Sequence, residues 1–134
     1  MTAEEELVRE VWRRWNEGVR KWDPELFDPE AEVHSALTGG LFKGEAQILR
    51  WQDEIDQQFE QWEVSAASIE RVSDDRILVD GMIKARGRGS GMDLDQPAAW
   101  TVELRDGRVW RLRNFIGSGS AREAAENLGW DVGS

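Results

Sequence analysis

The chain has 134 residues, a formal net charge of −10 at pH 7, 40% hydrophobic residues and no cysteine. This length predicts a single domain, residues 1–134, because one domain usually contains about 100–200 residues. The negative charge argues against nucleic acid or an anionic membrane as a partner, since both would repel the protein.

The residue types also limit cofactors and location. One histidine and no cysteine leave only carboxylates as further metal ligands, so we expect no metal and no cofactor. The first twelve residues are too charged for a signal peptide, and no window approaches about 18 consecutive apolar residues. We therefore expect a cytoplasmic protein, which the absence of cysteine also fits.

Two amphipathic helices are predicted in the first half of the chain. Thr2 and Glu5 form a capping-box pattern that begins a helix from Ala3 to about Arg20. Asp23-Pro24 starts a short helical turn, and residues 31–37 read as a strand. A second helix is expected from about Glu45 to Gln61, with these residues on one stripe: Ile48, Trp51, Ile55, Phe59 and Trp62.

The rest of the chain predicts antiparallel strands. Alternating segments cover residues 64–72, 76–86, 92–105 and 109–116, and a short helix from Ala121 to Leu128 ends at Gly129. Helices followed by a curved meander predict an α+β domain with helices packed on one face of the sheet.

Asp106-Gly107 predicts a two-residue hairpin turn in which Arg105 faces Arg108. Continuing this register places Ala99, Thr101, Trp110, Leu112, Asn114 and Ile116 on one face. The other face then holds Trp100, Val102, Arg111, Arg113 and Phe115. Both faces carry large apolar groups, so both need a cover.

Several motifs in this order resemble the SnoaL-like branch of the nuclear transport factor 2-like superfamily, also called the ketosteroid isomerase-like fold. They are the FKGEAQI segment at 42–48, RGRGSG at 86–91, LRDGRV at 104–109 and the closing helix at 121–129. The resemblance implies a cone-shaped curved antiparallel sheet around an apolar pocket, with the helices on its concave face. It also implies a homodimer through the convex sheet face.

The resemblance implies isomerase, cyclase, dehydratase or hydrolase chemistry, or binding and assembly alone. The chain lacks the acid constellations of such enzymes and has no tyrosine, so ketosteroid isomerase chemistry is not expected. Two functions stay open. One is a cofactor-independent cyclase, isomerase or dehydratase; the other is a non-catalytic ligand-binding or dimeric assembly domain.

Three residues are the candidate catalytic groups: His34 as base, Asp80 to orient it, and Asn114 to hold a carbonyl oxygen. His34 is the only side chain with a reference pKa near neutrality, about 6.5, although an exposed strand histidine is the alternative. Asp80 interrupts an apolar strand. The alternatives are that its side chain turns to solvent or that it pairs with an Arg or Lys side chain on a neighbouring strand. Convergence of the three on one cavity would favour an enzyme, and scatter would favour binding.

The expected ligand is a small apolar or aromatic molecule. From the resemblance and the helix stripes, its pocket is expected to involve Trp15, Trp51, Met82, Ala99, Thr101, Trp110, Leu112 and Ile116. The expected dimer interface on the convex face comprises Ile77, Val79, Ile83, Ala85, Trp100, Val102 and Phe115.

Overall fold

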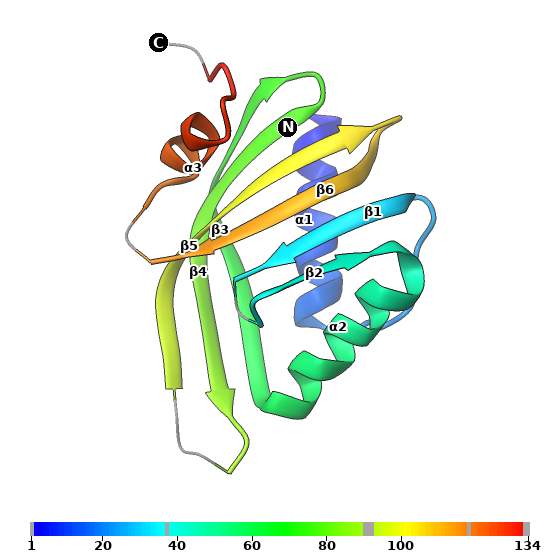
Figure 1. Ribbon diagram of the computed structural model, residues 1–134, viewed down its shortest axis with the longest axis vertical. Coiled ribbons are helices and arrows are strands. Elements are labelled where there is room, and N and C mark those ends of the chain that lie inside the picture. Colours follow the sequence, from blue (N-terminus) through cyan, green and yellow to red (C-terminus); the bar gives the residue numbers. More distant parts are fainter. Residues whose placement is uncertain (1, 37, 90–92, 118, 133–134) are drawn as a thin grey trace.

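The computed structural model describes residues 2–36, 38–89, 93–117 and 119–132. Its elements are α1 (Ala3–Asn16), β1 (Phe27–Ser35), β2 (Gly40–Lys43), α2 (Gly44–Gln58), β3 (Phe59–Ser73), β4 (Arg76–Gly87), β5 (Asp93–Arg105), β6 (Arg108–Ile116) and α3 (Ala121–Asn127). The strands form one curved sheet in the order β2-β1-β6-β5-β4-β3 (Figure 1). The expected α+β class is confirmed. The sheet is mixed rather than wholly antiparallel, because β1 runs parallel to β6.

Both long helices end earlier than their apolar stripes predict. Gly18 adopts a φ of +76°, which favours glycine, and its N–H donates to the Trp15 carbonyl at 3.1 Å. This C-terminal cap ends α1 at Asn16 instead of Arg20. At the end of α2, Phe59 is already extended and begins β3, so Phe59 and Trp62 belong to a strand. The predicted strand ends at Leu37 and Met92 lie outside the described residues.

The helices divide the sheet into an inner face, covered by α1 and α2, and an outer face, which α3 partly covers (Figure 1). The main core lies on the inner face, where Val11 and Ile48 of the helices pack in one cluster with strand residues such as Val33 and Val102. A smaller cluster on the outer face joins α3 and the following Trp130 to the strands through Leu78 and Ala99. Burial of these side chains supplies the main favourable free energy of the fold.

A one-residue irregularity in the last hairpin changes the predicted faces. The turn pairs Arg105 with Arg108, as expected, but the register then shifts, so that Glu103 pairs with Arg111 rather than Trp110. Such a bulge moves every later side chain to the opposite face. Leu112 and Asn114 therefore share the inner face with Trp100, whereas Ala99 and Thr101 lie on the outer face.

The expected apolar dimer interface is overturned by this arrangement. Ile77, Val79, Ile83, Trp100 and Val102 lie in the inner core, beneath the helices. Phe115 alone of the named set packs with the outer cluster, and Ala85 is buried.

In the described part of the chain, no helix is both long and apolar enough to span a membrane.

Candidate functional site: a tryptophan-lined cavity and its cleft

A small cavity lies between the helices and the inner face of the sheet. Helix residues Trp15 and Trp51 line it, together with strand residues Val33, Ser35, Trp62, Val64, Ile83, Trp100, Leu112 and Asn114. Its volume is about 20 Å³, which is room for one water-sized group. Of these ten residues, only Ser35, Asn114 and the indole N–H groups are polar, and none is ionisable.

Four of the ten residues that line the cavity are tryptophans. The Trp15 ring lies 5.7 Å from Trp51 in an edge-to-face arrangement and 6.3 Å from Trp62, measured between ring centroids. Trp12 contacts two of these rings: its ring centroid lies 5.2 Å from that of Trp15 and 5.0 Å from that of Trp100. Aromatic pairs in such arrangements contribute about 0.5–1.5 kcal/mol beyond the burial of their area, which favours these ring positions.

The polar groups of the cavity differ in whether they have hydrogen-bond partners. The Ser35 Oγ accepts a hydrogen bond from the Thr38 N–H at 3.2 Å. With its amide oxygen facing Trp100, Asn114 accepts from the Trp100 Nε1 at 3.2 Å and from the Phe115 N–H at 3.1 Å. The Nε1 atoms of Trp51 and Trp62 are buried and have no hydrogen-bond partner within the described residues. Two donors at this cavity are therefore unused.

A larger open cleft adjoins the cavity. It has a volume of about 770 Å³ and is formed by the end of α1, the junction of α2 with β3, and the adjacent ends of β4 and β5. Trp15 and Trp62 line both the cleft and the cavity. These two rings therefore lie at the boundary between the open cleft and the enclosed cavity.

Arg20 fixes one side of this boundary. Its Nε and Nη2 donate to the two carboxylate oxygens of Asp56 at 2.9 and 3.0 Å, which links the segment after α1 to α2. The guanidinium carbon also lies 5.8 Å from the centroid of the Trp62 ring, within cation–π range. Arg20 thus places a positive charge beside Trp62.

The three candidate catalytic residues do not converge. Asn114 lines the inner cavity, but His34 lies on the outer face of β1, opposite Arg113 of β6. Asp80 is also on the outer face, where its Oδ1 accepts from the Ala121 N–H at 2.8 Å and supports the start of α3. The three groups are therefore scattered over two faces of the sheet, because β4 presents Val79 rather than Asp80 to the core.

The predicted ligand-binding residues are divided in the same way. Trp15, Trp51 and Leu112 line the cavity, and Ile116 packs against the inner core. Four others lie elsewhere. Ala99 belongs to the outer cluster, Thr101 is fully buried on the outer side of β5, and Met82 sits between Ser65 and Pro97 in the ladder. Trp110 contacts the guanidinium groups of Arg105 and Arg111, 4.8 and 4.3 Å from its ring centroid.

Sequence reasoning missed the pocket roles of Trp62, Trp100 and Ser35. The stripe that assigned Trp62 to a helix did indicate a buried ring, but not its position on β3. Trp100 was expected on the outer face of the sheet, because the wrong set of alternating strand residues was assigned to the inner face. Ser35 follows His34 directly, so alternation along the strand sends one of them inward, and the structure shows that it is Ser35.

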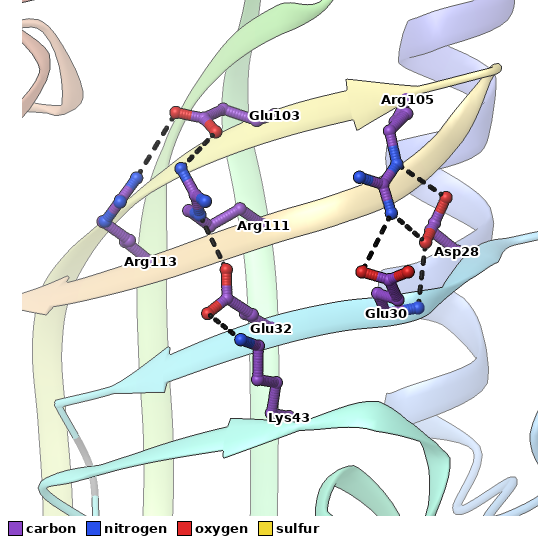
Figure 2. Close-up of polar contacts among 8 residues, drawn as sticks. All are labelled: Asp28, Glu30, Glu32, Lys43, Glu103, Arg105, Arg111 and Arg113. Carbon is purple, nitrogen blue, oxygen red and sulfur yellow. Dashed lines mark hydrogen bonds and ion pairs between the residues drawn. The ribbon is translucent and has the colours of Figure 1, made fainter.

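Charged groups instead fill the outer face of β1, β5 and β6 (Figure 2). Glu103 accepts from Arg111 at 3.1 Å and from Arg113 at 3.4 Å, and Arg111 also donates to Glu32 at 2.9 Å. The hydrogen bond from Arg111 lowers the pKa of Glu32. Burial, and then the nearby Arg113 charge, lower the pKa of His34. This region is an ion-pair network rather than a cavity.

No group of three or more His, Cys, Asp or Glu residues in the described ranges could hold a metal ion.

The family model for the SnoaL-like domain matches residues 8–112, and the chain belongs to this family. No curated protein is significantly similar to the sequence. Among solved structures, a protein with the ketosteroid isomerase-like fold from Catenulispora acidiphila DSM 44928, in complex with trimethylamine, has 17% identity and a TM-score of 0.71. The match covers 94% of this chain and 97% of that one.

Two further structures are similar over nearly their whole length. TerC, co-crystallized with polyporic acid, has 15% identity and a TM-score of 0.75, covering 95% of this chain and 98% of that one. A candidate SnoaL-like polyketide cyclase from Shewanella putrefaciens CN-32 has 14% identity and a TM-score of 0.73, with 96% and 98% covered. These similarities show a shared fold.

Proposed function

We propose that this protein binds a small apolar or aromatic molecule in the cleft, against Trp15 and Trp62, and performs no acid–base catalysis at the inner cavity. The observation that carries the proposal is the composition of the cavity: four indole rings, four aliphatic residues, Ser35 and Asn114. Sites of this kind, mainly apolar with a few fixed polar groups, are typical of small-molecule binding.

At the inner cavity, the catalytic alternative lacks its central requirement. A cyclase, isomerase or dehydratase that transfers protons needs a titratable group within hydrogen-bond reach of the ligand. No ionisable side chain lines the cavity in the described part of the chain. His34 and Asp80, the two titratable candidates from the sequence, lie on the other side of the sheet. The acidic residues and Lys84 that line the cleft lie outside the cavity lining.

The size of the two spaces supports binding at the cleft rather than deep inside. A volume of about 770 Å³ falls within the usual range for ligand sites, about 300–1,000 Å³. The cavity of about 20 Å³ accepts only a small group. We therefore place the body of the ligand in the cleft, against the apolar surface of Phe59 and Leu94; charged side chains form much of the rest of the cleft lining.

A homodimer is still a prediction, but the apolar surface that motivated it is not exposed. The apolar residues that led to it are buried inside one chain, and the outer face near β1 and β6 carries the ion pairs of Figure 2. Any dimer through that face would have to keep these charges paired.

Titration with the hydrocarbon 2-isopropenylnaphthalene tests the proposal, with quenching of tryptophan fluorescence as the readout. Because Trp62 borders both spaces, Trp62→Ala is expected to weaken binding at least about tenfold, as the loss of a ring contact implies. Trp110→Ala is the matched control, since Trp110 lies against two arginines instead. Equal affinities for the two variants, or no binding by the wild type, would refute the proposed function. Polyporic acid and trimethylamine, the ligands in two of the similar structures, are titrated in the same way for comparison.

A further inference from the structure

We propose that the inner cavity is a subsite for one neutral hydrogen-bond-accepting oxygen, such as that of a ketone or ether. The ligand's apolar body then lies in the cleft, and its oxygen reaches Trp51 or Trp62. This inference rests on the proposed function and adds the chemical class of the ligand.

The unused donors give the first reason. Trp51 is only 5% exposed, and its Nε1 and that of Trp62 are buried without a partner in the residues that the structure describes. An indole N–H can only donate a hydrogen bond. A buried donor left unpaired costs about 1–3 kcal/mol. An acceptor atom that reaches either N–H removes that cost, whereas a methylene group does not.

The dimensions give the second reason. The cavity of about 20 Å³ holds a single water-sized group. A carbonyl or ether oxygen is of that size, and a ring system is not. Because Trp15 and Trp62 line both spaces, a ligand bound against these rings in the cleft lies next to the cavity.

A cationic ligand fits the same residues poorly, although tryptophan rings often bind ammonium groups by cation–π contact. No carboxylate lines the cavity among the described residues, so nothing compensates the desolvation of a buried charge. Arg20 already places its guanidinium 5.8 Å from the Trp62 ring. An anionic group is equally unmatched, since none of the described residues that line the cavity is cationic and Arg20 is paired with Asp56.

The test compares two ligands of nearly the same shape: 2-acetylnaphthalene, which carries a carbonyl oxygen, and 2-isopropenylnaphthalene, in which a CH₂ group replaces it. The ketone is expected to bind the wild type about 3- to 10-fold more tightly, the ratio that one net hydrogen bond gives. In ¹H–¹⁵N spectra, the indole N–H resonance of Trp51 or Trp62 is expected to move downfield with the ketone only.

Trp51→Phe and Trp62→Phe keep a ring but remove the N–H. At least one of them is expected to bring the ketone-to-hydrocarbon ratio close to one. Trp12→Phe is the control, because its Nε1 is also buried and unpaired but Trp12 does not line the cavity. Circular dichroism checks that each variant is folded.

The outcomes separate the two proposals. If neither naphthalene binds, the proposed function fails and this inference fails with it. If both bind the wild type equally, or if the ratio survives in Trp51→Phe and Trp62→Phe alike, only the oxygen subsite is refuted. Tighter binding of tetramethylammonium than of the ketone, with the same indole resonances shifted, would likewise refute it in favour of a cation site.

Discussion

Arg105 and Asp28 form a two-point ion pair between the β5–β6 hairpin and the start of β1 (Figure 2). Arg105 donates from Nε and Nη2 to the two carboxylate oxygens of Asp28, at 3.0 and 2.7 Å. The Asp28 side chain is 7% exposed and also accepts from the Glu30 N–H at 2.9 Å. The Arg105 hydrogen bond, followed by that from Glu30, lowers the pKa of Asp28.

Replacing Asp28 with asparagine is expected to lower the free energy of unfolding at pH 7 by about 1–3 kcal/mol, because a charge-assisted hydrogen bond is lost. A lowered pKa means that this contribution is present above the unfolded-state pKa, about 3.9, and is lost as the pH falls through the folded-state value. Urea unfolding at pH 7 and near pH 2 should therefore show a difference at neutral pH that shrinks in acid.

Glu30→Gln is the matched control for Asp28→Asn. Glu30 also faces Arg105, but at 3.8 Å and with a side chain that is 76% exposed. An exposed pair contributes about 0–1 kcal/mol. Similar losses of stability for Glu30→Gln and Asp28→Asn would contradict the role assigned to the half-buried pair of Asp28 and Arg105.

Gly81 is required by close approach of two strands. A Cβ at this position would lie 1.8 Å from the Ser65 carbonyl oxygen of β3. Because backbone must move to relieve that clash, Gly81→Ala is expected to destabilise the protein by at least about 2 kcal/mol in thermal or urea unfolding. At Gly119 a Cβ meets only the Glu123 side chain, at 3.7 Å, so Gly119→Ala should be nearly neutral. A stable Gly81→Ala variant would show that β3 is not held this closely.

His34 is expected to make stability depend on pH near neutrality. Burial of its ring, followed by the Arg113 charge, lowers its pKa in the folded state. Below the unfolded-state pKa of about 6.5, the unfolded chain then binds the proton more readily than the folded chain does. The free energy of unfolding should consequently fall as the pH drops from 7.5 toward 5. His34→Gln should remove that part of the decrease; an unchanged pH profile would exclude the effect.

The sequence predicted the elements and their order better than the directions of their side chains. The Asp106-Gly107 turn and the Arg105–Arg108 pair are confirmed. The bulge at Trp110 is not encoded in alternation, because it depends on where the ring finds contacts, here with Arg105 and Arg111. One extra residue was enough to separate Leu112 and Asn114 from Ala99 and Thr101.

The candidate site was predictable in part for the same reason. Trp15 and Trp51 lie on helix stripes, and a stripe always faces the core, so their burial followed from spacing alone. For a strand with polar residues on both sides, alternation gives two sets of residues but does not say which set faces inward. His34 and Asp80 were assigned on residue chemistry, and packing of Val33 and Val79 placed them on the outer face.

Asp80 is expected to contribute to stability rather than to ligand binding. Its Oδ1 accepts from the Ala121 N–H at 2.8 Å, while Ser120 caps the same end of α3 by accepting from the Glu123 N–H at 3.1 Å. Loss of one such acceptor costs about 0.5–2 kcal/mol, so Asp80→Ala should lower the free energy of unfolding by that amount. Hydrogen exchange should become faster in α3, whose Ala125 packs against the sheet together with Trp130. Affinity for 2-isopropenylnaphthalene should be unchanged at every pH, because Asp80 does not line the cleft or the cavity. A weaker affinity in Asp80→Ala, with α3 protected as in the wild type, would instead return Asp80 to the binding site.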